Sequence, residues 1–236
     1  MGATGRGIVA SMALPFADRE EAGRELARAL ESLRLDEPLV LGVPRGGVAV
    51  AAPVARALAG ELDVIVVRKV GAPTQPELGI GAVGAWGEPW LDERLVQALG
   101  VPSDRLRLEI DIERAEARRR VEAYRVNARP ADTAGTDVAH PDVEGRDVVV
   151  VDDGIATGGT VITAARLLRV RGPSRLVLAV PVAPAEGVRR AEEAYDDVVA
   201  VHTPEPFYAV GQWYRDFHQV SDDEVRALLA GVSQDR

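Results

Sequence analysis

The sequence predicts an α/β protein with a doubly wound, mainly parallel sheet flanked by helices. Residues 148–151 are four consecutive valines, and an unbroken β-branched run is typical of a parallel strand that is buried on both faces. Similar apolar runs at 39–43 and 175–182 alternate with segments of helical periodicity. With 47% hydrophobic residues, a chain of 236 residues can bury a sizeable core.

The N-terminal half is predicted to follow the order helix, strand, helix, strand. Residues 18–33 carry apolar positions at helical spacing with acids in the first turn, which favours an amphipathic helix. Next come a strand at 39–43, a tight turn at 44–47, an alanine-rich helix at 48–59 and strands at 62–67 and 80–85. The strand, helix, strand succession is a βαβ unit, and such crossovers are almost always right-handed.

The second half is predicted to hold a helical insertion and the rest of the sheet. The insertion lies near 92–129, with helices at 92–99 and 104–125, and a polar connection at 131–144 follows it. After the valine strand we expect a helix beyond residue 160, a strand at 175–182, a helix at 185–194 and a strand at 197–202. The chain is therefore expected to divide into an N-terminal extension (1–17), a core (18–203) and a C-terminal hood or tail (204–236).

The valine strand ends in two acids, Asp152 and Asp153, followed by a loop of small residues and threonines at 154–160. Ligands of open α/β sheets bind outside the carboxyl ends of the strands. Small residues let backbone N–H groups converge on an anion at the N-terminus of the next helix. The loop therefore predicts a phosphate site, and the acids suit the hydroxyl groups of a sugar that carries the phosphate.

Two common phosphate loops are excluded by spacing. A Walker A loop ends in Gly-Lys-Ser/Thr, whereas this loop ends in Gly158, Gly159 and Thr160 without a lysine. A dinucleotide fingerprint needs GxGxxG and an acid about 20 residues later, and neither is present here. A sugar phosphate is the ligand that remains, against the alternative of a glycine-rich turn with an acidic cap.

The strand, the paired acids and the Gly/Thr loop resemble the signature of the type I phosphoribosyltransferases, which bind 5-phosphoribosyl 1-pyrophosphate (PRPP). The resemblance in the order of elements covers residues 18–203. It implies that Asp152 and Asp153 hold the ribose 2′ and 3′ hydroxyls. The residues it assigns to the 5′-phosphate are Gly154, Ile155, Ala156, Thr157, Gly158, Gly159 and Thr160.

The resemblance also implies a pyrophosphate site. In that family the loop after the first sheet strand binds pyrophosphate through backbone N–H groups, often with a strained or cis peptide. Arg45, Gly46 and Gly47 stand at that position, and Lys69 follows the second strand, where the family carries a basic residue. Lys69 is the single lysine among 28 basic residues. The alternatives are an ordinary βα turn and a surface lysine.

The implied reaction is transfer of 5-phosphoribose from PRPP to a small-molecule acceptor, with inversion at C1 and release of pyrophosphate. Asp152, Asp153 and Lys69 are the expected catalytic residues. Mg²⁺ is the expected cofactor, held by Asp152 and Asp153 directly or through water. A segment at 71–79 or the connection ending near 144 is expected to close over the site. The family suggests a homodimer.

The C-terminal segment is rich in aromatic side chains. Its five rings are Phe207, Tyr208, Trp213, Tyr214 and Phe217, half of the ten in the chain. The resembled family uses a variable hood to select the acceptor, so Trp213 or Tyr214 is expected to contact it. The alternative is a tail that these rings dock onto the sheet, and the acceptor itself is not identified. Ser221 is expected to cap a last helix.

Composition limits the partners. A net charge of −9 disfavours nucleic acid and anionic membranes, no apolar run reaches membrane-spanning length, and the first residues do not resemble a secretory signal. The chain has no cysteine, and its three histidines lack zinc spacing, so a cytoplasmic protein is expected. The arginine-rich stretch at 114–129 favours a solvated helix face; the alternative is an arginine face that reaches the pyrophosphate.

Two other functions stay open. A PRPP-binding regulator would keep the pocket without turnover, although such proteins tend to carry a nucleic-acid-binding module, and no such module is evident in this acidic sequence. A phosphohydrolase or phosphotransferase would use Asp152 as nucleophile, but the sequence shows no accompanying cluster of metal-binding acids.

Overall fold

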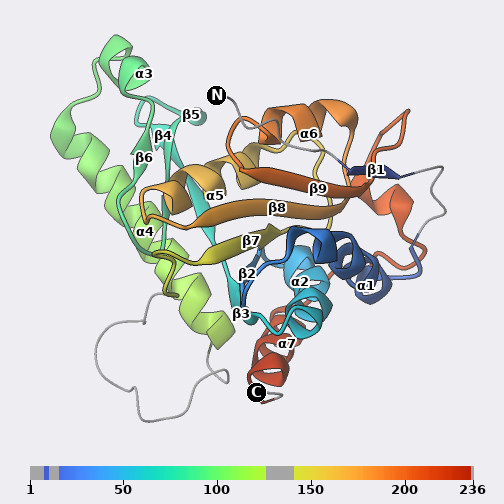
Figure 1. The fold of residues 1–236 in the computed structure, drawn as a ribbon. Helices are drawn as coiled ribbons and strands as arrows, with labels where there is room; N and C mark the ends of the chain where they lie inside the picture. The colour runs from blue at the N-terminus through green and yellow to red at the C-terminus, as the bar shows by residue number, and fades with distance from the viewer. Residues whose placement is uncertain (1–7, 11–15, 126–140, 235–236) are drawn as a thin grey trace.

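The structure, a computed structural model, describes residues 8–10, 16–125 and 141–234 (Figure 1). Its main sheet is parallel throughout and confirms the predicted fold class. In sheet order its strands are β1 (Ile8–Ala10), β9 (Asp197–His202), β8 (Arg175–Val182), β7 (Asp147–Val151), β2 (Leu39–Gly42) and β3 (Glu61–Val64).

Helices cover both faces of this sheet, as a doubly wound fold requires. One face carries α1 (Arg19–Leu30), α2 (Gly46–Ala57) and α7 (Asp222–Gln234), and the other carries α5 (Gly159–Arg169) and α6 (Ala185–Ala191). The valine strand contributes to both cores, with Val149 and Val151 on one face and Val148 and Val150 on the other. The prediction of a strand buried on both faces is confirmed.

A second sheet, which the sequence did not predict, holds three antiparallel strands: β4 (Val67–Ala72), β5 (Gln75–Gly84) and β6 (Trp90–Leu91). The single strand expected at 62–67 is wrong, because β3 ends at Val64 and the chain then enters this other sheet. The strand expected at 80–85 is only the end of β5. A side chain at Gly71 would collide with the backbone of Pro76, so glycine permits the tight hairpin where the prolines indicated a loop.

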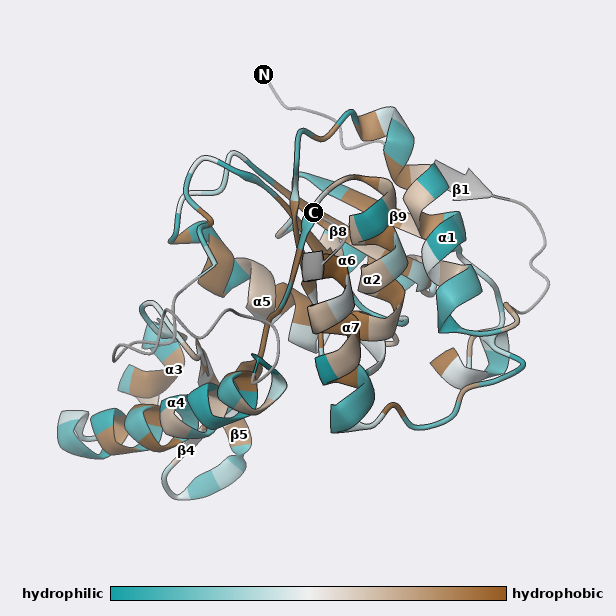
Figure 2. Cartoon of the chain, turned by 90° about the horizontal axis from the view of Figure 1, so that it is seen from below, coloured by the Kyte–Doolittle hydropathy of each residue, from teal (hydrophilic) through white to brown (hydrophobic). Residues whose placement is uncertain are grey.

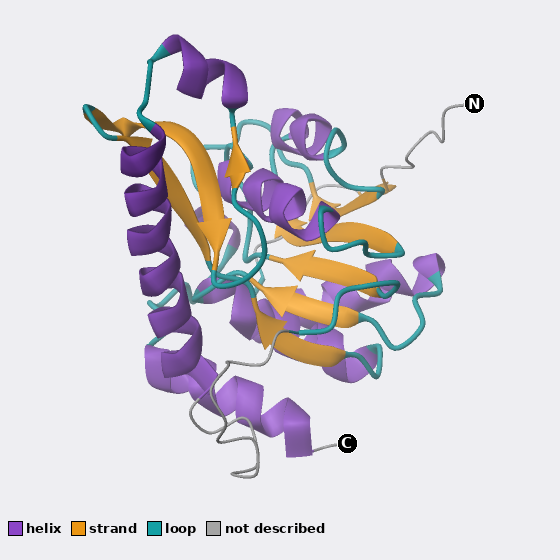
Figure 3. Ribbon diagram, turned by 90° about the vertical axis from the view of Figure 1, so that its left-hand side faces the viewer, coloured by secondary structure: helices purple, strands orange, loops and turns teal. Residues whose placement is uncertain are grey.

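The predicted helical insertion is confirmed as α3 (Glu93–Ala98) and α4 (Ser103–Arg125). In Figure 3, α4 runs along the antiparallel sheet, and a small separate core forms between them, centred on Val70, Ile80 and Ile110. The far end of α4 returns to the main sheet, where Arg125 forms a buried ion pair with Asp63 of β3. The connection expected at 131–144 lies outside the described residues up to 140.

The helix α7 and two short helices complete the described fold. The helix α7 packs against α2 and α4 (Figure 2). The side chains of Ser221 and Glu224 each accept a hydrogen bond from the other's backbone N–H, which confirms the predicted cap. The short helix η1 (Glu31–Leu33) extends α1, and η3 (Val210–Trp213) lies in the C-terminal segment. None of the described helices is both long and apolar enough to span a membrane.

Candidate functional site

Two loops meet at the carboxyl ends of β2 and β7, which are neighbours in the sheet. A side chain at Gly46 would overlap the carboxylate of Asp153, and a Cβ at Gly47 would lie 2.6 Å from the carbonyl oxygen of Val151. Both glycines are therefore required for the two loops to touch. The structure thus brings the expected pyrophosphate loop against the paired acids, although the two segments are about a hundred residues apart in sequence.

The first loop carries a cis peptide bond between Pro44 and Arg45, at the position where the resemblance expects one. Arg45 then occupies the N-cap position of α2 without a side-chain hydrogen bond to the helix, and its side chain is 39% exposed. Its Nη1 lies 3.7 Å from a carboxylate oxygen of Asp222, at the start of α7. This distance is long for a hydrogen bond, so Arg45 presents a partly solvated positive charge at the mouth of the site.

Asp152 and Asp153 each have one carboxylate oxygen held by the protein. In Asp152 this oxygen accepts the backbone N–H of Asp153 at 2.9 Å, and in Asp153 it accepts Arg19 Nε, also at 2.9 Å. Burial raises the pKa of Asp152 well above its ordinary value, and the charge of Asp153 adds to this effect. Burial also raises the pKa of Asp153, while Arg19 lowers it. Desolvated neighbouring acids favour a ligand that supplies hydroxyl donors or a cation.

The second loop leads from these acids into α5. Gly154 and Gly158 have φ of 155° and 76°, which glycine adopts without steric cost. The N–H of Ile155 donates to Val182 O at 3.1 Å, so it anchors the loop and is not free to meet a phosphate in this structure. The N–H groups of residues 156–160 donate to no other described residue. They open the helix and lie where an anion is favoured.

A cleft of about 540 Å³ adjoins the first loop and the start of α5. Arg45 and Thr160 line it from the core, and Arg119, Arg120 and Tyr124 line it from α4. Both α4 arginines pair with Glu116, at 2.7 and 2.8 Å, which agrees with the expected solvated face. The same two arginines also line the cleft, and an arginine face that reaches the pyrophosphate would need this placement.

The structure does not bring Lys69 to this cleft. Lys69 lies in β4, half exposed, and its Nζ donates to the carbonyl oxygen of Glu77 at 3.0 Å. The carboxylate of Glu77 is 3.5 Å away. Val67, two residues earlier, does line the cleft, so the hairpin begins at the site and carries Lys69 away from it.

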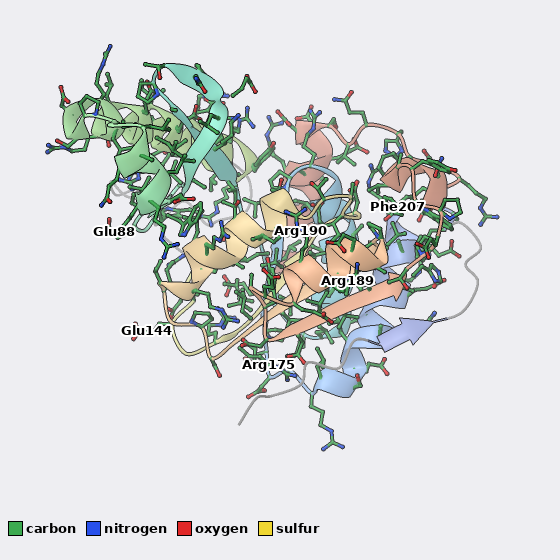
Figure 4. All side chains as sticks on the ribbon, turned by 90° about the horizontal axis from the view of Figure 1, so that it is seen from above. Glu88, Glu144, Arg175, Arg189, Arg190 and Phe207 are labelled. Atoms are coloured by element: carbon green, nitrogen blue, oxygen red, sulfur yellow. The ribbon has the colours of Figure 1, made fainter. Side chains whose placement is uncertain are left out.

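The C-terminal segment lies on the other side of the core from the antiparallel sheet, as Phe207 shows in Figure 4. Tyr214 is 6% exposed, and its ring contacts those of Phe16 and Phe217. Its hydroxyl donates to the carbonyl oxygen of Asp153 at 2.5 Å. The buried Nε1 of Trp213 has no partner among the described residues. Tyr214 therefore contacts the acid pair but does not offer an open stacking face.

One residue of the site was missed from the sequence. Arg19 lies in the first turn of α1, 134 residues before the acid that it contacts. Its side chain is only 9% exposed, which is unusual for arginine. No local motif indicates this contact, because an arginine in the first turn of an amphipathic helix is ordinarily exposed.

Known proteins are similar to this chain over most of its length. The family described as "Phosphoribosyl transferase domain" matches residues 16–215. The Mycobacterium tuberculosis protein named "Putative phosphoribosyl transferase Rv0571c" is 43% identical over 220 residues, which are 93% of this chain and 47% of that protein. The chain thus spans about half the length of this curated relative.

A solved structure and a shorter match complete the comparison. The crystal structure of TT1426 from Thermus thermophilus is 45% identical in sequence, and the match covers 92% of this chain and 99% of that chain. The TM-score of the two structures is 0.79. "Uracil phosphoribosyltransferase" of Lactobacillus gasseri is 45% identical over 58 residues, 25% of this chain and 28% of that protein. Because the family match spans most of the sequence, this chain belongs to the phosphoribosyl transferase domain family.

Proposed function

We propose that this protein transfers 5-phosphoribose from PRPP to a small-molecule acceptor and releases pyrophosphate. The observation that carries the proposal is the contact between the two loops, in which the Gly46–Gly47 backbone packs against the paired acids. The two carboxylates, the free N–H groups of 156–160 and the charge of Arg45 lie at one edge of the sheet, where the carboxyl ends of β2 and β7 meet, and Arg45 and Thr160 also line the cleft. PRPP carries hydroxyls, a 5′-phosphate and a pyrophosphate that would meet these groups.

The proposed roles follow from the placement of these groups. The free carboxylate oxygens of Asp152 and Asp153 accept the ribose hydroxyls, and the N–H groups before α5 bind the 5′-phosphate. The first loop and Arg45 bind the pyrophosphate. Lys69 contributes only if the hairpin moves, because its side chain is now paired with Glu77. The acceptor is a nucleobase or another small nucleophile.

Catalysis in this proposal is mainly electrostatic. Cleavage of the C1–oxygen bond makes the ribose ring positive and the departing pyrophosphate negative. The acid pair lies on the side of the ribose, and Arg45 lies on the side of the leaving group. Arg45 would therefore offset the negative charge that develops on the pyrophosphate, and the carboxylate oxygens would face the ring that becomes positive. The bound geometry would hold C1 for attack from the opposite face.

The donor set of the site fits Mg²⁺. The two acids offer carboxylate oxygens that accept no hydrogen bond from another described residue, and the described residues contain no cluster of three or more potential metal-ligating side chains. Two protein carboxylates suit Mg²⁺, which keeps several waters and binds substrate phosphates. When bound, the ion would neutralise charge on the pyrophosphate. Mg²⁺ use, a cytoplasmic location and a homodimer stay predictions.

A pyrophosphate exchange assay tests the function. The protein is incubated with PRPP, Mg²⁺, labelled pyrophosphate and a panel of nucleobases and other small amines and hydroxyl compounds, and label in PRPP is measured. We expect exchange with at least one acceptor, and its loss in the double variant Asp152→Asn with Asp153→Asn. Asp147→Asn, at the opposite end of β7, is the matched control. PRPP binding without exchange would indicate the regulator, and PRPP binding by the double variant equal to that of the unchanged protein would refute the site.

A further inference from the structure

Arg19 is held in one orientation by contacts on several sides. Its Nε donates to Asp153 Oδ2 at 2.9 Å, and its Nη1 donates to the carbonyl oxygen of His218 at 2.8 Å. Its guanidinium lies 4.0 Å from the ring centroid of Phe217 and 5.8 Å from that of Tyr214. A planar cation over an aromatic ring, with two hydrogen-bond acceptors at its edge, has little freedom to rotate. Arg19 thus joins the C-terminal segment to the second acid of the site.

The C-terminal segment reaches Asp153 by a second contact. The Tyr214 hydroxyl donates to the backbone carbonyl of Asp153 at 2.5 Å. The segment itself is fastened to the residues just before Arg19, because Phe16 N–H donates to Trp213 O and Arg215 N–H donates to Phe16 O, each at 2.8 Å. Arg19 and Tyr214 therefore approach the same acid from one continuous framework.

The pairing leaves part of Asp153 available. Arg19 takes Oδ2, and no described residue donates a hydrogen bond to Oδ1. The side chains of Arg19 and Asp153 are 9% and 16% exposed, so water screens their attraction poorly. A Cβ at Gly46 would fall within 3.0 Å of Arg19 Nε as well as on the Asp153 carboxylate. Arg19 thus lies directly behind the contact between the two site loops.

An unpaired Asp153 would be poorly placed. Two adjacent carboxylates repel each other, and the free energy of repulsion is larger in a site that excludes water. Without a fixed cation, the Asp153 side chain would turn away from Asp152 or rotate among several positions. Both acids must point in one direction if they are to accept two neighbouring hydroxyls of the same ring.

We propose that Arg19 is a positioning residue that orients Asp153 to bind the pentose of PRPP, with Tyr214 holding the backbone of the same acid. This inference rests on the proposed function. It assigns the aromatic C-terminal segment a role at the sugar-binding acids rather than only at the acceptor. Arg19 touches no substrate atom itself and acts through Asp153.

The test measures PRPP affinity by isothermal titration calorimetry in the presence of Mg²⁺, for the full chain and four variants. We expect Arg19→Gln to weaken PRPP binding about tenfold. Arg19→Lys should recover part of the loss, because a lysine keeps the charge but not the planar stacking. Tyr214→Phe keeps the ring and removes only the hydroxyl, so it should fold and weaken binding by a smaller factor. Arg24→Gln removes an exposed ion pair of the same helix and should leave affinity unchanged.

A double-mutant cycle separates positioning from a general loss of structure. In an Asp153→Asn background, Arg19→Gln should weaken PRPP binding by less than about twofold, because the residue through which Arg19 acts is already changed. If Arg19 had only a structural role, Arg19→Gln would weaken PRPP binding by the same factor with and without the Asp153→Asn substitution. Thermal unfolding of each variant confirms that the binding is measured on folded protein.

The outcomes separate the inference from the proposed function. If the unchanged protein fails to bind PRPP, the proposed function is refuted and the inference with it. If the unchanged protein binds PRPP but Arg19→Gln binds equally well, or loses the same factor in both backgrounds, the positioning role is refuted and the function stands. Should Arg19→Gln not fold, unchanged affinity in both Arg19→Lys and Tyr214→Phe overturns the inference.

Discussion

Asp152 and Asp153 are neighbours in the chain but differ in what holds them. Arg19 neutralises Asp153, whereas no described basic side chain contacts Asp152. Such a difference suits a site in which one acid is oriented by the protein and the other is left to its ligand. Burial disfavours the charged form of Asp152, so keeping an acid at this position lowers the stability of the fold, a loss that is common at binding sites.

The first prediction contrasts the stability of the two amide variants. Asp152→Asn should raise Tm, since it removes a charge that burial disfavours; a gain of about 1 kcal/mol corresponds to about 2–4 °C in a chain of this size. Asp153→Asn should lower Tm, because Arg19 would stay buried without its counterion, at a cost of about 1–3 kcal/mol. Differential scanning calorimetry measures both. A lower Tm for Asp152→Asn would contradict this description of the site.

The second prediction concerns pH. The folded-state pKa of Asp152 is raised above its ordinary value of 3.8, so between these two values the folded protein binds more protons than the unfolded chain. The free energy of unfolding must then fall as pH rises through this window, and the loss is complete above the folded pKa. Tm measured against pH should fall less steeply in Asp152→Asn than in the unchanged protein. If Tm falls equally steeply with pH in both proteins, Asp152 is not the group that causes the pH dependence.

At the scale of elements, the sequence predicted the valine strand, the loop after it and the βα turn at 44–47 because each has a strong local signal. The β4–β5 hairpin had none. Gly71, Pro73, Pro76 and Gly79 indicated a broken loop. In the structure Pro73 lies in the hairpin turn, and only pairing across the hairpin makes the other three residues part of a strand. The split between β3 and β4 was missed for a related reason. Residues 62–67 are apolar except for Asp63, and only the folded structure divides them between two sheets.

The third prediction belongs to α4. Arg119 and Arg120 line the cleft beside Arg45, so changing both to glutamine should weaken pyrophosphate binding several-fold, and more at low salt than at high salt. Tm should change little, because the two side chains are 67% and 44% exposed. Arg105→Gln, on an exposed turn near the start of α4, is the control. The measurement is a titration of each protein with inorganic pyrophosphate in the presence of Mg²⁺. If the double variant binds pyrophosphate as tightly as the unchanged protein at low salt, the two arginines do not bind pyrophosphate.

At the scale of the whole molecule, the core built on the parallel sheet has two additional parts on different sides. The antiparallel sheet and α4 border the first loop, and the C-terminal segment borders the acids. The core was predictable because buried parallel strands repeat a simple apolar pattern. The contact of Arg19 with Asp153 was not, since it joins residues far apart in sequence whose meeting depends on how α1 packs against the sheet.

The most direct measurement is a crystal structure of the protein soaked with PRPP and Mg²⁺. We expect ribose hydroxyls within about 3 Å of carboxylate oxygens of Asp152 and Asp153. We also expect the 5′-phosphate on the N–H groups of residues 156–160 and the pyrophosphate against Gly46 and Gly47. PRPP bound elsewhere, or a 5′-phosphate outside the loop before α5, would refute the proposed site.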